Sequence, residues 1–233
     1  MNKFNLFSKS LNKDMTVNVY GEGKKPYIVF PTSEGNAGDF ENFSMISSIN
    51  EQHGFKRITL YCIESHDSKT FYNTDDPKVR ISRHADYENY VFEELIPFIK
   101  KKHKNNFIGF IGCSFGGYHA INFGLKHPDI VKEMISLIGI FDIQIFFDSY
   151  YDENIYFNCP LNYLRNLNDT HIIRQMKEQK IYLGTGTNDF CLDENKRLSQ
   201  NLTYLGIPHL LDIWEGADHH WYWWKMQVNK FLR

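Results

Sequence analysis

A serine between two glycines is the pattern in this chain most suited to chemistry. Gly112, Ser114 and Gly116 form a G-x-S-x-G motif, with an apolar run over 107–111 before it and a helical pattern over 118–125 after it. In such a strand–turn–helix arrangement, a nucleophile elbow, the turn is too tight for a Cβ two residues before or after the serine. The strained turn lifts the serine hydroxyl to the carboxyl end of the sheet. We therefore expect Ser114 to be a nucleophile.

A serine hydroxyl is a weak nucleophile at neutral pH, so it needs a base within hydrogen-bond reach, and a third group must orient that base. After a nucleophile elbow, the acid and the histidine follow the serine along the chain in that order. Asp189 follows an apolar run over 181–183, and His219 follows another over 209–214. Both should therefore lie in loops at the carboxyl ends of the last two strands. The sequence predicts a triad of Ser114, His219 and Asp189.

Two other residues compete for these roles. Asp142 follows the strand expected at 133–140 and stays open as an alternative acid, because a carboxylate after that strand would reach the same sheet edge. His220 adjoins His219, and residue chemistry alone does not separate the two, since either could reach a serine from a loop.

Other reactive side chains are predicted to have structural roles. Asp193 is expected to cap the following helix, and His119 to be a packing or capping residue. Asp75 and Asp76 lack the spacing of a calcium loop and are expected to be solvated. A cysteine hydrolase using Cys113 is disfavoured because the residue before the tip of an elbow points away from the site.

The oxyanion of a tetrahedral intermediate needs two fixed hydrogen-bond donors. The backbone amide of Phe115, the residue after the nucleophile, is expected to be one of them. The second should come from the loop after a short strand at 27–30, with Ser33 or Thr32 as the donor. The choice between these two residues stays open.

Composition limits the class of protein. The chain has 233 residues, enough for one α/β domain with a large core, and a net charge of −2 that gives no case for binding nucleic acid or an anionic membrane. No run approaches the roughly 18 apolar residues of a membrane helix, and no apolar signal segment is present at the start. Four scattered cysteines without C-x-x-C pairs suggest reduced thiols and a cytoplasmic location. No metal or cofactor is implied, and association of identical copies stays open.

The elements that must position the candidate residues alternate between strand and helix. This alternation predicts a mostly parallel sheet of about eight strands with helices on both faces, after an antiparallel opening pair. Strands are expected at 4–11, 15–20, 27–30, 57–63, 107–111, 133–140, 181–183 and 209–214. Helices are expected at 43–52, 84–101, 118–125, 194–205 and from about 221, with a kink or register shift at Pro97.

Two segments fall outside this alternation. Residues 69–82 are expected to form a loop. The segment 143–178 is rich in aromatic residues without a clear period, and it is expected to be a small cap inserted in the single domain of residues 1–233.

Several short motifs together resemble a known family. The chain is similar to an esterase family of α/β-hydrolases related to enterochelin esterase, S-formylglutathione hydrolase, and acetyl or feruloyl esterases. The motifs that carry this resemblance over nearly the whole chain are Phe30-Pro31-Thr32, His84-Ala85-Asp86-Tyr87-Glu88, Gly112-Cys113-Ser114-Phe115-Gly116-Gly117, Phe147-Asp148-Ser149-Tyr150-Tyr151 and Gly216-Ala217-Asp218-His219-His220-Trp221.

The resemblance implies an α/β-hydrolase fold and a serine esterase that forms an acyl-enzyme on small carboxylic or thio esters. Relatives commonly end in Gly-x-His-Asp-Trp, which favours His219 as the base when Trp221 is matched to the tryptophan. His220 then stands where an aspartate is usual. Two alternatives stay open: an acyltransferase that uses the same acyl-enzyme, and a non-catalytic binding protein with the same fold.

Overall fold

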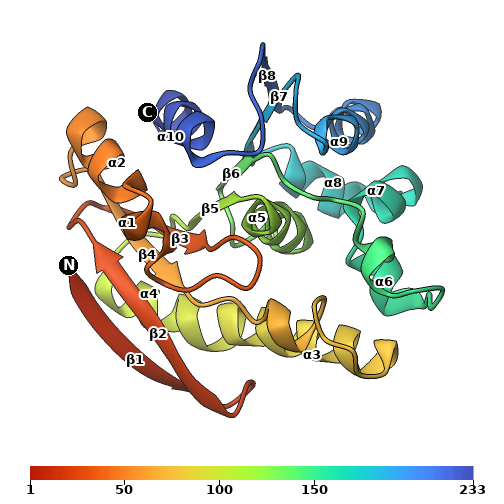
Figure 1. The fold of residues 1–233 in the computed structure, drawn as a ribbon, viewed down its shortest axis with the longest axis horizontal. Coiled ribbons are helices and arrows are strands. Elements are labelled where there is room, and N and C mark those ends of the chain that lie inside the picture. Colours follow the sequence, from red (N-terminus) through yellow and green to blue (C-terminus); the bar gives the residue numbers. More distant parts are fainter. Residues whose placement is uncertain (233) are drawn as a thin grey trace.

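A single eight-stranded sheet organises the computed structural model, which describes residues 1–232 (Figure 1). The strand order is β1-β2-β4-β3-β5-β6-β7-β8; β1 and β2 are antiparallel to their neighbours, and the other strands are parallel. The strands are β1 Asn2–Ser8, β2 Lys13–Tyr20, β3 Lys25–Phe30, β4 Ile58–Ile63, β5 Gly109–Cys113, β6 Glu133–Leu137, β7 Lys180–Gly186 and β8 Leu210–Trp214. The predicted α/β-hydrolase sheet is confirmed.

Helices cover both faces of the sheet (Figure 1). One face carries α1 Asp39–Asn42, α2 Met45–His53 and α10 Trp221–Phe231. The opposite face carries α3 Pro77–Asn89, α4 Ile96–Lys102, α5 Phe115–Lys126 and α9 Leu192–Tyr204. None of the helices in residues 1–232 is both long and apolar enough to cross a membrane.

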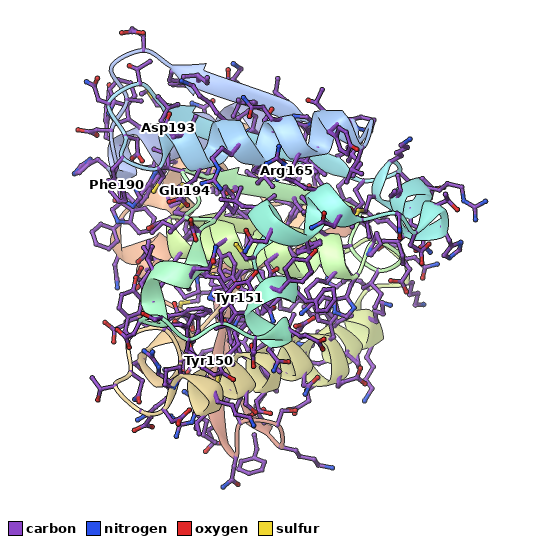
Figure 2. The ribbon with its side chains drawn as sticks, turned by 90° about the vertical axis from the view of Figure 1, so that its right-hand side faces the viewer. Tyr150, Tyr151, Arg165, Phe190, Asp193 and Glu194 are labelled. Atoms are coloured by element: carbon purple, nitrogen blue, oxygen red, sulfur yellow. The ribbon has the colours of Figure 1, made fainter. Side chains whose placement is uncertain are left out.

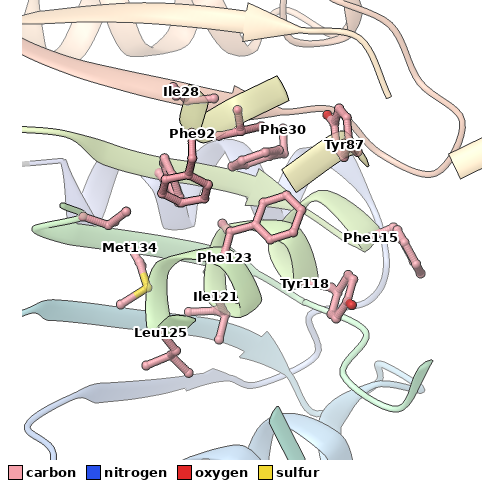
Figure 3. Packing of buried hydrophobic residues seen from close by; sticks show 14 of the residues in the cluster. Ile28, Phe30, Tyr87, Phe92, Phe115, Tyr118, Ile121, Phe123, Leu125 and Met134 are labelled. Carbon is pink, nitrogen blue, oxygen red and sulfur yellow. The ribbon is translucent and has the colours of Figure 1, made fainter. Parts of the chain in front are cut away.

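The central strand β5 is buried on both sides because its side chains alternate between two hydrophobic clusters. Phe110 belongs to the cluster under α5, and Ile111 belongs to the cluster under α2 and α10. Figure 3 shows Phe123 of α5 facing Phe30 and Phe92 in the first cluster, where the ring centroids lie 5.8 and 6.3 Å apart. This packing holds α5 against the sheet directly behind the elbow.

The predicted loop over 69–82 is wrong in its second half, because α3 begins at Pro77. Asp76 is its N-cap, and the carboxylate accepts a hydrogen bond from the amide of Lys78 at 2.8 Å. Asp75 pairs with Arg83 at 2.6 Å. A proline in the first turn after an aspartate is a helix start signal, and it outweighs the polar composition of the segment.

The predicted register shift near Pro97 is confirmed. The helical segment 84–101 divides into α3, a π-helical stretch η2 at Tyr90–Leu95, and α4. Pro97 lies in the first turn of α4, directly after η2, and a proline has no amide with which to continue the hydrogen bonds of the preceding helix.

The segment 143–178 lies between β6 and β7 as a series of short helices. They are η3 Ile143–Phe146, α6 Glu153–Phe157, α7 Pro160–Tyr163, η4 Leu164–Asn166 and α8 Thr170–Met176. The segment is tied to α5, because the carbonyl of Asn158 accepts a hydrogen bond from the Tyr118 hydroxyl at 2.8 Å. It is also tied to α9, because Asn201 donates to the carbonyl of Leu161 at 3.2 Å. Its role as a cap stays a prediction.

Candidate active site

Ser114 occupies the turn between β5 and α5 with a backbone φ of +55°, a left-handed conformation that is rare outside glycine. A Cβ on Gly112 would collide with the backbone of Gly116, and a Cβ on Gly116 would collide with the carbonyl of Pro31. The two glycines therefore allow the tight turn, and they also let the loop after β3 approach the start of α5. Ser114 is 5% exposed.

Ser114, His219 and Asp189 are joined by hydrogen bonds. Nε2 of His219 lies 2.8 Å from Oγ of Ser114, and Nδ1 of His219 lies 2.9 Å from Oδ2 of Asp189. The other oxygen of Asp189 accepts a hydrogen bond from the amide of Cys191 at 2.7 Å. Asp189 lies in the loop after β7, and His219 lies in the loop between β8 and α10. Three loops at one edge of the sheet thus bring the three residues together.

Two aromatic rings flank the imidazole of His219. The ring centroid of Phe190 lies 4.6 Å away at an interplanar angle of 32°, and that of Trp224 lies 5.1 Å away with its plane nearly perpendicular. Phe190 is 74% exposed, and Figure 2 shows it at the edge of the molecule near the start of α9. The side chain of His219 is 23% exposed, so solvent still reaches the imidazole.

The two competing residues make different contacts. Asp142 caps η3, and its carboxylate accepts hydrogen bonds from the backbone amide and the side chain of Gln144, both at 3.3 Å. Nη1 of Arg197 lies 4.0 Å from Oδ2 of the same carboxylate. His220 caps α10, because its Nδ1 accepts a hydrogen bond from the amide of Tyr222 at 3.2 Å. Each therefore has a local structural role at the start of a helix.

Two structural predictions have different outcomes. The prediction that Asp193 caps α9 is wrong: the helix begins at Leu192, so Asp193 lies inside its first turn. His119 is packed as expected, and its Nε2 lies 2.8 Å from Oδ1 of Asp67, with both side chains 1% exposed. Sequence reasoning missed Asp67, because its partner is 52 residues away and no local pattern links them.

The thiol groups near the elbow are buried. Burial raises the pKa of the Cys113 thiol well above its ordinary value, which opposes formation of the nucleophilic thiolate. Asp189, Cys191 and His219 offer three metal-binding atoms within 4.8 Å of one another in the described chain. A metal ion there would compete for Nδ1 of His219 and for the Asp189 carboxylate, which already bind each other.

The expected oxyanion donors lie on neighbouring segments. The amide of Phe115 is at the start of α5, where amides have no partner within the helix, and no hydrogen bond outside α5 uses it in residues 1–232. The Thr32 hydroxyl donates to Asp39 at 3.1 Å, and the Ser33 hydroxyl lies 2.8 Å from that of Tyr72. Within the described chain neither the backbone amide of Thr32 nor that of Ser33 has a hydrogen-bond partner, so each can donate to a ligand.

Several proteins of known activity are similar to this chain. An acetyl esterase of Caldicellulosiruptor saccharolyticus is 24% identical over 269 residues, covering 99% of this chain and 94% of that protein. A ferulic acid esterase structure superposes with a TM-score of 0.78 at 18% identity, covering 99% of this chain and 95% of the other. The S-formylglutathione hydrolase of Staphylococcus aureus superposes with a TM-score of 0.69 at 15% identity, covering 99% and 96% of the two chains. At these identities the structures establish a shared fold.

A family model gives the stronger assignment. The family described as "Putative esterase" matches residues 8–233. The match includes the elbow at Ser114 and the loops that carry Asp189 and His219, so it covers every element of the site described above. The chain therefore belongs to this esterase family.

Proposed function

We propose that the protein is a serine esterase that hydrolyses small carboxylic or thio esters through an acyl-enzyme. The observation that carries this proposal is the unbroken hydrogen-bonded series from Ser114 through His219 to Asp189, at 2.8 and 2.9 Å. A hydroxyl, an imidazole and a buried carboxylate in this order are what nucleophilic catalysis by serine requires.

The geometry supports a two-stage reaction. Oγ of Ser114 attacks the ester carbonyl carbon while Nε2 of His219 takes the hydroxyl proton, and Asp189 stabilises the resulting imidazolium. The tetrahedral intermediate collapses, the bond to the alcohol or thiol breaks, and His219 gives the proton to this leaving group. Water then attacks the acyl-enzyme by the same steps, which releases the carboxylic acid and restores Ser114.

The developing negative charge would be stabilised by two amides. That of Phe115 lies at the N-terminus of α5, where the helix dipole also favours an anion. On the loop after β3, the backbone amides of Thr32 and Ser33 are both free to donate within the described chain. We assign Ser33 as the second donor, because its side chain contacts Tyr72, whose ring packs against Phe115 beside the first donor.

Two features bear on the substrate and on the second reactant. The rings of Phe190, Phe146 and Tyr72 lie around His219 and Phe115, which suits an acyl group with apolar or aromatic character. Substrates named for the similar proteins, acetyl, feruloyl and formylglutathione esters, fall within this range. The exposure of His219 favours water over an alcohol as the second reactant, because transfer to an alcohol needs a site that excludes water.

The test is covalent labelling combined with a substrate panel. A fluorophosphonate should label Ser114 stoichiometrically and abolish hydrolysis of p-nitrophenyl, feruloyl and acetyl-sugar esters and of glutathione thioesters. Ser114→Ala should neither react nor hydrolyse any of them. Cys113→Ala should keep most of its activity, because Cys113 lies on the buried side of the elbow.

Three results would reject the proposal. Labelling at Cys113 would assign the reaction to the thiol. Full hydrolysis by Ser114→Ala would separate the activity from the elbow, and a folded wild-type protein that neither reacts nor hydrolyses any member of the panel would identify a binding protein instead.

A further inference from the structure

The hydroxyl of Tyr72 joins the loop after β3 to the loop after β4. Its Oη lies 2.8 Å from Oγ of Ser33. The Tyr72 ring packs edge-on against the rings of Phe115 and Phe146, with centroids 5.8 and 5.3 Å away. One side chain therefore contacts the residue that follows Ser114 and also the loop that carries the second candidate amide.

Tyr72 is in turn held by Asp67, whose side chain is hydrogen-bonded to a buried histidine. Its amide donates to the carbonyl of Asp67 at 3.0 Å, and the amide of Thr70 donates to the same oxygen at 3.0 Å. The carboxylate of Asp67 binds His119 of α5 at 2.8 Å, with both side chains 1% exposed. A continuous series of contacts thus runs from the helix behind the nucleophile, through Asp67 and Tyr72, to Ser33.

The loop after β3 needs such support. Glu34 has a φ of +53°, a strained conformation for a residue with a side chain. Thr32 is anchored through its bond to Asp39, but the bond to Tyr72 is the one hydrogen bond that Ser33 makes in residues 1–232. A donor to an oxyanion must be held within about 0.5 Å of its productive position. The turn closed by the amide of Gly35 on the carbonyl of Thr32 at 2.9 Å sets the path of the loop, and Tyr72 supplies the side-chain contact that holds Ser33 within it.

We propose that Tyr72 is a positioning residue of the oxyanion site, whose hydroxyl holds Ser33 with its backbone amide toward the oxygen of the tetrahedral intermediate. The inference rests on the serine esterase function proposed above. Burial raises the pKa of Tyr72, so the phenol keeps its proton at neutral pH and can hydrogen-bond to Ser33. Loss of this contact should lower kcat rather than raise KM, because the oxyanion charge develops only after the substrate is bound.

Tyr72→Phe keeps the ring contacts and removes only the hydroxyl. We expect kcat on a small p-nitrophenyl ester to fall about tenfold, less than the 10²–10³ for losing an oxyanion donor outright. KM should change less than about twofold. Affinity for a boronic acid that mimics the tetrahedral intermediate should fall in parallel with kcat. A purely structural role of Tyr72 would not reproduce this combination.

A double-mutant cycle identifies the atom through which Tyr72 acts. Ser33→Ala removes the serine hydroxyl but keeps the backbone amide, so it breaks the same contact from the other side. If the contact positions the amide, Tyr72→Phe combined with Ser33→Ala should be no slower than the slower single variant. Losses that multiply would show that the Tyr72 hydroxyl acts on the substrate directly, which would overturn the inference. If Tyr72→Phe failed to fold, Ser33→Ala alone should still lower kcat, and an unchanged kcat would refute the proposal.

The control is another tyrosine with one side-chain hydrogen bond. The hydroxyl of Tyr61, a residue of β4, lies 2.9 Å from Nε2 of His103. Tyr61→Phe should keep the wild-type kcat. Fluorophosphonate labelling of Ser114 separates the two proposals. Normal labelling with an unchanged kcat in Tyr72→Phe would refute the role of Tyr72 alone, whereas failure to label Ser114 in the wild-type protein would refute the esterase function itself.

Discussion

At the scale of single residues, backbone position gives two adjacent histidines different tasks. His219 lies before α10 and directs one ring nitrogen to Ser114 and the other to Asp189. His220 is the N-cap of α10 and accepts a hydrogen bond from a backbone amide of its first turn. A capping residue has its side chain turned back toward the helix, so it is not available to the serine.

Replacing each histidine by alanine should separate these tasks. We expect His219→Ala to lower kcat/KM at least about a thousandfold, as for loss of a triad member. His220→Ala should lower it about tenfold or less and should reduce the free energy of unfolding by about 1 kcal/mol through loss of the cap. Steady-state kinetics and chemical denaturation measure the two effects, with circular dichroism to verify folding. An inactive His220→Ala beside an active His219→Ala would reverse the assignment.

At the scale of elements, a polar network fastens the inserted segment to the helices beside the elbow. Glu88 of α3 accepts hydrogen bonds from Lys126 at 2.5 Å and from His127 at 2.7 Å, at the end of α5. Lys126 also donates to the side chain of Asn158, which precedes α7, at 3.0 Å. One carboxylate thus stabilises the contact of α3 with α5 and, through Lys126, the contact with the insertion.

This network should make stability depend on pH through Glu88. Burial alone would raise the pKa of Glu88, but the hydrogen bonds and charges of His127 and Lys126 outweigh it, and the folded-state pKa is lowered below the usual 4.5. The carboxylate therefore stabilises the fold above its unfolded pKa, and this contribution is lost as the pH falls through the lower folded-state pKa. Glu88→Gln should destabilise the protein by about 2 kcal/mol at pH 7, and by progressively less below about pH 4.5.

Thermal unfolding of both proteins across pH 3–7 measures this difference. Glu51→Gln, on the exposed side of α2, is the control and should follow the wild type at every pH. A destabilisation by Glu88→Gln that is the same at pH 3 and pH 7 would show that the carboxylate charge does not stabilise this junction.

At the scale of the whole molecule, the tryptophans gather at one end of the fold. All four lie between residues 214 and 224: Trp214 ends β8, and the other three are in the first turn of α10, on either side of the His219 loop. Trp224 contacts the imidazole of His219, and Trp221 stacks on Phe43 at 4.5 Å with nearly parallel planes. Intrinsic tryptophan emission should therefore report events at the His219 loop and little elsewhere.

Phosphonylation of Ser114 should shift the tryptophan emission, because it alters the charge and contacts of His219 beside Trp224. Fluorescence spectra before and after reaction with a fluorophosphonate measure the shift. Ser114→Ala treated in the same way should show none. Stoichiometric labelling without any spectral change would place the His219 loop away from the reacting serine in solution.

Local patterns in the sequence are enough to predict the sheet and the three residues at the centre of the candidate site. Glycines two positions from Ser114 are required by one tight turn, and apolar runs of strand length predict β5, β7 and β8. The carboxyl ends of parallel strands meet at one edge, so the order of strands also indicates where Asp189 and His219 lie. The same reasoning does not exclude Asp142, which also follows a strand of the sheet, or His220, which adjoins His219.

The tertiary structure decided what local pattern does not encode. Asp142 and His220 proved to be caps, the role predicted for Asp193 was wrong, and α3 started at Pro77 within a predicted loop. The contact of Tyr72 with Ser33 joins residues 39 positions apart in different loops, and no period or motif relates them. Such contacts depend on how the ends of separate strands are brought together, so they become visible only when the whole sheet has formed.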